Sequence, residues 1–318
     1  TSEAYERAFP RVPYLHGLIK IRNIDFPTQD REALRKVINP ETAAFLTPNH
    51  PEYFSDWLID KELSRHVAPY IACWAWWEFV NMGPIIQKLL LAHNTIAAGI
   101  PGGSTGKQYA KSCVKRGDAS LIHPEGTVYW HSRHMGDMRD GVAEMALEIA
   151  KELAASGEIR PVFIAPVVFK YRYVSDQSRE LVAQISQMEK AYELPEGKDL
   201  DLVQRFAWLQ CSLLQRKSEQ YGAIVGSAIE DVTSDNFFAI QERLEKSLTH
   251  ALGRRDVHIR SVPAIEVKGM PRDAESERIY KEDIMREVKS RMQGALDALH
   301  QELEPSNRFT WSNPFYTS

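Results

Sequence analysis

Cysteine is scarce in this chain. Its 318 residues include three cysteines, Cys73, Cys113 and Cys211, which lie far apart and lack C-x-x-C spacing. Such a set excludes a disulfide framework and a zinc knuckle, and it indicates buried free thiols in a reducing compartment. No long apolar run is present either. The most apolar stretch, residues 67–100, is interrupted by polar side chains such as Glu78 and Lys88, whereas a membrane-spanning helix needs about 20 apolar residues.

An excess of positive charge is also missing. The chain has 39 Lys and Arg against 43 Asp and Glu, a net charge of −4. Without a basic field, we expect no nucleic-acid partner. The polar start of the chain does not resemble a secretory signal, so we expect a cytoplasmic protein, with peripheral membrane contact as an option. The sequence begins at Thr1 and not at a methionine, which leaves open that an organellar targeting peptide was removed upstream.

Short apolar segments alternate with helical patterns over the first half of the chain. Strands are expected at residues 17–24, 43–47, 71–77, 95–100, 119–123 and 162–173, and helices at 30–38, 51–67, 78–94, 108–118 and about 142–153. This alternation predicts an α/β fold, a layered αβα core with a largely parallel or mixed sheet. Ligands bind such sheets at the carboxyl ends of the strands.

Three regions are expected. Residues 1–175 form the α/β core, and residues 176–256 form a helical insertion. Residues 257–318 supply a final strand, a long amphipathic helix and an aromatic tail that pack on the core. The apolar stripe of the long helix consists of Ile284, Val288, Met292, Leu296, Leu299 and Leu303. This stripe favours packing on the protein itself over contact with a membrane or a partner.

A histidine and a carboxylate stand close together after the strand at 43–47. In the string NHPEYFSD, Asn49 and His50 end the strand, and Asp56 lies in the helix that follows. A histidine is an effective general base when a carboxylate orients its other ring nitrogen. The alternative is that His50 caps the helix and Asp56 is a solvated side chain.

A second string, HPEGT, follows the buried strand at 119–123. Pro124 and Gly126 favour a turn around Glu125, with Thr127 next in the chain. Peptide groups near Gly126 could bind an oxyanion, and Glu125 could bind a substrate hydroxyl or brace the turn. The alternative is an ordinary turn at the end of a strand.

Taken together, these strings resemble the glycerolipid acyltransferase family, which includes lysophosphatidic acid and glycerol-3-phosphate acyltransferases. NHPEYFSD is similar to its NH-x4-D block, with five residues between His50 and Asp56 instead of four. Residues 76–100 resemble the stretch leading to the second block, and HPEGT is similar to FPEGT. Pro161 or Pro166 resembles the fourth block, a proline in a late strand. The resemblance covers residues 43–169.

The resemblance implies an acyltransferase. Acyl-CoA or acyl-ACP would donate a fatty acyl group to a lysophospholipid, a glycerol phosphate or a related alcohol, as in phospholipid biosynthesis. His50 would deprotonate the acceptor hydroxyl and Asp56 would orient its ring. Asn49, Pro124, Glu125, Gly126 and Thr127 would line the substrate site. Neither a metal nor a cofactor is implied, although the donor could arrive on an acyl carrier protein.

The chain departs from the family pattern in two ways. One affects whether Asp56 can reach His50, and the other affects the positive charge available to bind the acceptor. The extra residue rotates Asp56 by about 100° around a helix, unless a longer loop or a π-bulge absorbs it. The family's phosphate-binding arginines are replaced by Val128 and by Lys107, so Lys107 and Arg133 become candidates for binding the acceptor.

Three rival functions stay open. One is a non-catalytic acyl- or lipid-binding protein on the same fold, and another is a thioester hydrolase with water as acceptor. The third is a metal-dependent enzyme built on His123, His131 and His134, although their spacing is more typical of polar loop residues.

Overall fold

One mixed sheet organises the molecule. A computed structural model describes residues 20–52, 54–67, 70–76, 80, 83–98, 104–126, 128, 134–194, 200, 205, 208–209, 253–268 and 271–303. Within these ranges the strands are β1 (Ile21–Asp25), β2 (Ala43–Pro48), β3 (Ala72–Trp76), β4 (Thr95–Ala98), β5 (Ala119–Leu121), β6 (Val162–Tyr173), β7 (Arg255–Ser261) and β8 (Ile265–Glu266). Their order is β1-β7-β6-β2-β5-β3-β4, and β8 pairs with β6.

Most of the sheet is parallel. Strands β6, β2, β5, β3 and β4 run in one direction, while β7 and β8 pair with β6 in the antiparallel sense. Strand β1 runs parallel to β7. The predicted α/β fold with a largely parallel or mixed sheet is therefore confirmed.

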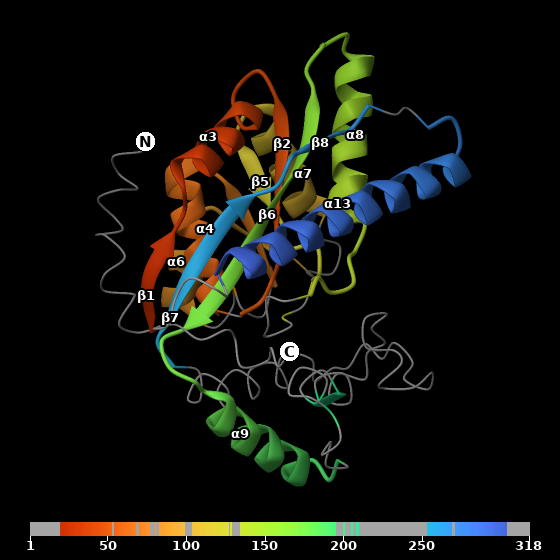
Figure 1. The fold of residues 1–318 in the computed structure, drawn as a ribbon. Coiled ribbons are helices and arrows are strands. Elements are labelled where there is room, and N and C mark those ends of the chain that lie inside the picture. The colour runs from red at the N-terminus through yellow and green to blue at the C-terminus, as the bar shows by residue number, and fades with distance from the viewer. Residues whose placement is uncertain are drawn as a thin grey trace.

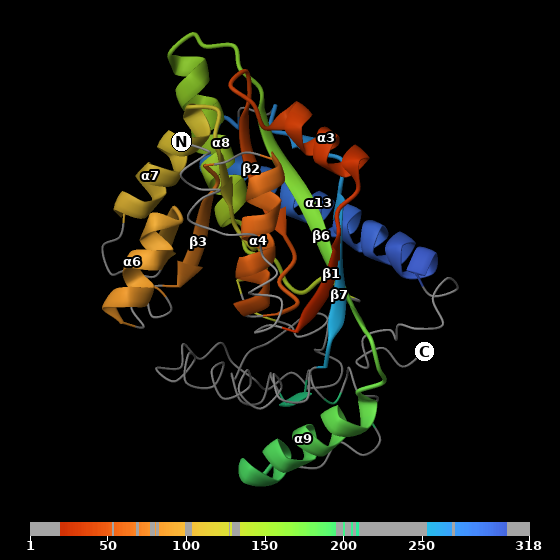
Figure 2. The same ribbon diagram turned by 90° about the vertical axis from the view of Figure 1, so that its left-hand side faces the viewer.

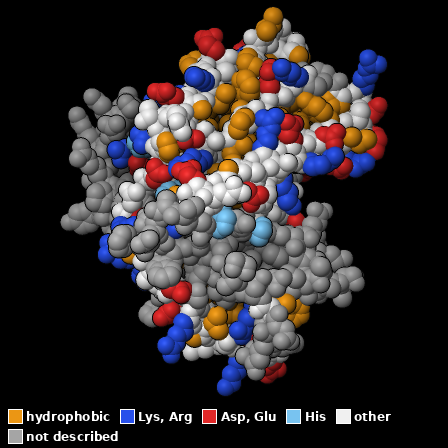
Figure 3. Space-filling view, viewed as in Figure 1, with side chains coloured by type: hydrophobic (Ala, Val, Ile, Leu, Met, Phe, Trp, Pro, Cys, Tyr) orange, Lys and Arg blue, Asp and Glu red, His pale blue; other side chains and the backbone are white. Residues whose placement is uncertain are grey.

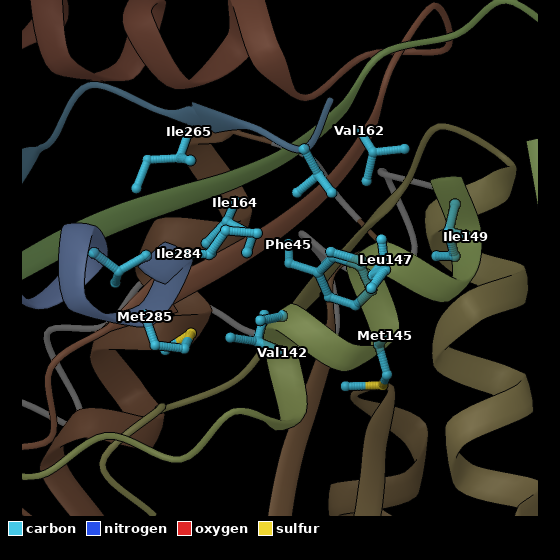
Figure 4. Close-up of a cluster of buried hydrophobic side chains, with 14 of the residues drawn as sticks. Phe45, Val142, Met145, Leu147, Ile149, Val162, Ile164, Ile265, Ile284 and Met285 are labelled. Atoms are coloured by element: carbon cyan, nitrogen blue, oxygen red, sulfur yellow. The ribbon is translucent and has the colours of Figure 1, made fainter. Parts of the chain in front are cut away.

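Helices cover both faces of this sheet (Figures 1 and 2). The helices are α3 (Thr28–Val37), α4 (Phe54–Val67), α6 (Pro84–Ala92), α7 (Ser104–Lys115), α8 (Gly141–Ala155), α9 (Ser178–Ala191) and α13 (Ala274–Leu303). Side chains alternate between the faces along each strand, so Ala44 and Leu46 of β2 join the core under α3 and α4. Phe45 joins a second core with α8 and α13 (Figure 4).

The long C-terminal helix packs on the protein as its pattern predicts. All six residues of its apolar stripe are buried in α13, and Ile284, Val288, Met292 and Leu296 belong to the same core as Phe45. Figure 1 shows α13 crossing one face of the sheet. The aromatic tail expected after it lies outside the described residues.

One helix start differs from the expectation. Helix α4 begins at Phe54, so Pro51 lies in the approach to the helix and not in its first turn. The helix expected over 78–94 is described in part: Val80 is helical, and α6 begins at Pro84, directly after Gly83, whose φ of 147° is open to glycine and unfavourable for other residues. Helix α9 lies in the range where a helical insertion is predicted, and it is apart from the sheet in both views (Figures 1 and 2). Most of the rest of 176–256 is outside the described ranges.

Among the residues that the structure describes, no helix combines the length and the apolar character needed to cross a bilayer.

Candidate active site

His50 and Asp56 are in direct contact. Nδ1 of His50 lies 2.8 Å from Oδ2 of Asp56, and their side chains are 18% and 0% exposed. Strand β2 ends at Pro48, so the sheet delivers His50 to its carboxyl edge. The remaining ring nitrogen, Nε2, is the one left for a substrate. The pair therefore has the geometry of a histidine base oriented by a carboxylate.

A longer approach to the helix absorbs the extra residue between His50 and Asp56. Because α4 is an α-helix that begins at Phe54, Asp56 lies in its first turn, facing back toward the end of β2. The backbone N–H of Glu52 donates to Oδ2 of Asp56 over 2.8 Å. The sequence allows either a longer loop or a π-bulge at this point, and the structure has the longer loop.

Asp56 is surrounded by donors. Besides His50 and the N–H of Glu52, the hydroxyl of Tyr171 in β6 donates to its Oδ1. Burial raises the pKa of Asp56 well above its usual value, and the bonds from Tyr171 and Glu52 oppose that rise. Burial also lowers the pKa of His50 well below its usual value, and the charge of His123 lowers it further. His50 is therefore held as a neutral imidazole, the form that accepts a proton.

Glu125 braces the site. Its Oε2 accepts the backbone N–H of His50 and its Oε1 accepts that of Gly136, each at 2.6 Å. The side chain is buried, and burial raises its pKa to about 7, against the two N–H bonds and the His123 charge that lower it. Of the two roles expected for Glu125, the geometry favours bracing the turn over binding a substrate hydroxyl.

The turn that contains Pro124 and Gly126 is closed by its own backbone. The N–H of Gly126 donates to the carbonyl of His123 over 3.1 Å, and the carbonyl of Pro124 accepts the N–H of Arg139. Gly126 has a φ of 61°, and a Cβ there would lie 2.8 Å from Nε of Arg139. The N–H of Gly126 itself is thus used within the turn. That other peptide groups near Gly126 bind an oxyanion stays a prediction, because Thr127 lies outside the described residues.

Asn49 fastens β2 to β6. Its Oδ1 accepts the N–H of Phe169 over 2.6 Å, and its Nδ2 donates to the carbonyl of the same residue over 3.0 Å. This paired contact continues the β2–β6 ladder beyond Pro48. The role that the geometry gives Asn49 is to fix the backbone beside His50.

A second histidine–aspartate pair lies against the first. The rings of His50 and His123 stack at 4.2 Å with an interplanar angle of 19°. Nε2 of His123 lies 3.0 Å from Oδ2 of Asp60. The sequence places His123 at the carboxyl end of a strand and leaves it as a polar loop residue or as one that lines the mouth of the site; its contacts here are with His50 and Asp60. Asp60 was not a candidate, although its position four residues after Asp56 puts both carboxylates on one helix face.

A buried ion pair supports the approach to α4. The guanidinium of Arg255 in β7 pairs with the carboxylate of Glu52 and donates to the hydroxyl of Ser55 over 2.9 Å. It also lies over the Tyr171 ring, 5.6 Å from its centroid. Sequence reasoning did not select Arg255, because 203 positions separate it from Glu52.

Lys107 makes its contacts outside this network. The ammonium of Lys107 in α7 donates to Glu144 and Glu148 of α8, each at 2.6 Å. Thr127 and Arg133 lie outside the described residues. Across the ranges that the structure covers, no group of three or more His, Cys, Asp or Glu side chains has a metal-binding arrangement.

Comparison with protein-family models and with curated proteins finds no match to this chain.

Proposed function

We propose that this protein is an acyltransferase that moves a fatty acyl group from a thioester to a hydroxyl group. The observation that carries the proposal is the 2.8 Å contact between His50 and the buried Asp56 at the carboxyl edge of the sheet. A neutral, oriented imidazole at a strand end is suited to remove a proton from an alcohol. The resemblance of residues 43–169 to glycerolipid acyltransferases supplies the substrate class.

The reaction needs one base and no covalent intermediate with the enzyme. Nε2 of His50 takes the hydroxyl proton as the acceptor oxygen attacks the thioester carbonyl. Asp56 stabilises the imidazolium through Nδ1. When the tetrahedral intermediate collapses, the thiolate leaves and receives the proton from His50. The products are an ester and a free thiol, and His50 returns to its neutral form.

The donor in this proposal is acyl-CoA or acyl-ACP, and the acceptor is a lysophospholipid, a glycerol phosphate or a related alcohol. Such an acceptor would bring a cytoplasmic protein to a membrane surface, so peripheral attachment belongs to the proposal. Because Lys107 is paired with glutamates of α8, we do not assign it to the acceptor phosphate.

The test is acyl transfer by a His50→Ala variant. With labelled acyl-CoA and a panel of lysolipid, glycerol-phosphate and uncharged alcohol acceptors, we expect kcat/KM to fall about 100- to 10,000-fold. His66→Ala is the matched control, because His66 lies in α4 and also pairs with a carboxylate, that of Glu62. This control should retain full activity.

Each other outcome favours a different function. Unchanged transfer by His50→Ala would overturn the catalytic assignment. Binding of acyl chains without turnover by the wild-type protein would favour a non-catalytic binding protein. Rapid release of thiol with no acceptor present would favour a hydrolase.

A further inference from the structure

The fold sets two histidine–aspartate pairs side by side. Strands β2 and β5 are adjacent and parallel, with Leu46 opposite Leu121, so the residues beyond their ends emerge about 4.8 Å apart. His50 follows one strand and His123 follows the other, and their rings stack at 4.2 Å. Asp56 and Asp60 stand one helical turn apart on α4, and each meets one ring.

Both ring nitrogens of His123 face groups that only accept hydrogen bonds. Nε2 lies 3.0 Å from the Asp60 carboxylate. Nδ1 lies 3.1 Å from the carbonyl oxygen of Asn49 and 3.2 Å from that of Pro48. A neutral imidazole has a proton on one nitrogen only and would leave the other lone pair against an oxygen. The contacts are satisfied when both nitrogens carry protons, so His123 is an imidazolium.

The contacts of His50 do not require protons on both of its ring nitrogens. Its Nδ1 meets a carboxylate that already accepts hydrogen bonds from Glu52 and Tyr171. Two positive rings at stacking distance would repel each other. The charged ring is His123, and the stack therefore favours the neutral form of His50.

We infer that His123 is a positioning residue for the proposed reaction: its charged ring, held by Asp60 and two backbone carbonyls, fixes the plane of His50 and keeps it in the unprotonated form. This inference rests on the proposed function for its catalytic consequence, but the charge state of His123 does not. His123 touches His50 and is not assigned a contact with substrate.

The surrounding charges agree with this assignment. Burial lowers the pKa of His123, but the Asp60 carboxylate, the Asn49 carbonyl and the Glu125 charge together more than compensate, so the net direction is upward. The pKa of His50 moves downward through burial and the His123 charge. The titratable and charged groups around the two rings come from α4 and its approach and from the turn after β5, with a second set from β6, β7 and α13 behind them. Those that act on the rings themselves are Glu52, Asp56, Asp60 and Glu125. Behind them, Tyr171 donates to Asp56, Arg255 pairs with Glu52, and the charge of Lys289 acts on Glu125.

The proton balance shows what the stack does for catalysis. His50 takes a proton from the acceptor hydroxyl and becomes positive beside a ring that is already positive. The repulsion makes protonated His50 a stronger acid, which promotes return of the proton to the departing thiolate. His123 keeps its own protons throughout, so no proton is gained or lost by the second pair.

The experiment is an NMR titration of histidine-labelled protein. In the wild type we expect the ring nitrogens of His123 to have the shifts of an imidazolium at pH 7. In His123→Phe, which keeps a flat ring without charge, the titration midpoint of His50 should rise by about 1 pH unit or more. The acidic limb of the acyl-transfer profile should move upward with it. His66→Ala is the control and should leave the midpoint unchanged.

The outcomes separate this inference from the proposed function. A neutral tautomer of His123 at pH 7, or an unmoved His50 midpoint in folded His123→Phe, would overturn the inference even if acyl transfer is observed. A shifted His50 midpoint in a protein that transfers no acyl group would support the charge assigned to His123 and contradict its proposed role in catalysis. If His123→Phe does not fold, Asp60→Asn serves instead, because His123 then loses the carboxylate that holds its proton.

Discussion

Two regions of this molecule pair opposite charges in different surroundings. Between α7 and α8, lysines and glutamates spaced four residues apart form a ladder of ion pairs, made of Lys107, Lys111, Lys115, Glu144, Glu148 and Glu152. At the carboxyl edge of the sheet, Glu52, Asp56, Asp60 and Glu125 are all buried. The glutamates of the ladder are between 34% and 41% exposed.

The difference shows that burial decides how much stability is lost when a charged side chain loses its partner. Water solvates the two charges of an exposed ion pair almost as well as they solvate each other, so such a pair changes the free energy of unfolding little. A buried carboxylate must be matched by donors, or its burial is strongly destabilising. The edge network supplies those donors from β6, β7, two backbone turns and two histidines. Charges of both signs are interspersed on the described part of the face shown in Figure 3.

The largest effect is expected where the buried network loses a charge. Arg255→Met leaves the Glu52 carboxylate without the guanidinium that it meets in the structure. Removing one partner of a buried pair typically lowers the free energy of unfolding by about 3 to 5 kcal/mol. Denaturant unfolding at pH 7 measures it. The double variant Arg255→Met/Glu52→Gln should recover part of the loss. A single variant as stable as the wild type would show that the pair is not a buried charge pair in solution.

An intermediate effect is expected for Glu125, and it depends on pH. Burial raises its folded-state pKa to about 7, above the unfolded value of about 4.3. The folded state therefore holds the proton more tightly, and the contribution of Glu125 to stability is complete below pH 4.3 and is lost as pH rises through 7. The full loss is on the order of 3 to 4 kcal/mol, most of it between pH 5 and pH 8.

Glu125→Gln removes this titration, so its free energy of unfolding should decline less than that of the wild type between pH 5 and pH 8. Denaturant unfolding at both pH values makes the comparison. The exposed Glu32 of α3 provides the control, and Glu32→Gln should follow the wild-type curve. Parallel pH curves for the wild type and Glu125→Gln would contradict the assignment.

The smallest effect is expected in the ladder. Lys115 pairs with Glu152, and their side chains are 39% and 40% exposed. Lys115→Ala should change the free energy of unfolding by less than about 1 kcal/mol and should leave acyl transfer unchanged. Added salt should reduce even this difference. A loss as large as that of Arg255→Met would erase the contrast between the two regions.

Local pattern was enough for much of the fold. Strand β6 and helix α13 follow from the apolar run at 162–173 and from the stripe that begins at Ile284, because the periods of strands and helices are visible in sequence. His50 and Asp56 were identifiable because both lie within one strand–turn–helix unit. Their contact was undecided, since the same eight letters allow a helix that begins at Pro51 or at Phe54.

The partners of this pair were beyond the reach of the sequence. Arg255 meets Glu52 from 203 positions away, and Tyr171 meets Asp56 from 115 positions away. Such contacts depend on strand order, which places β6 next to β2 and β7 next to β6. The sequence carried one usable sign of the second pair, the four-residue spacing of Asp56 and Asp60, but His123 became its partner only through the pairing of β5 with β2.

The sequence by itself determined the layered α/β fold and a histidine at a strand end, because hydrophobic period and turn residues act locally. Only the tertiary structure decided which nitrogen of His50 meets Asp56. It also decided that Glu125 accepts hydrogen bonds from backbone N–H groups, and that the His123 ring stacks against the His50 ring. Those outcomes follow from burial and from the register of distant strands, which no short segment of the chain contains.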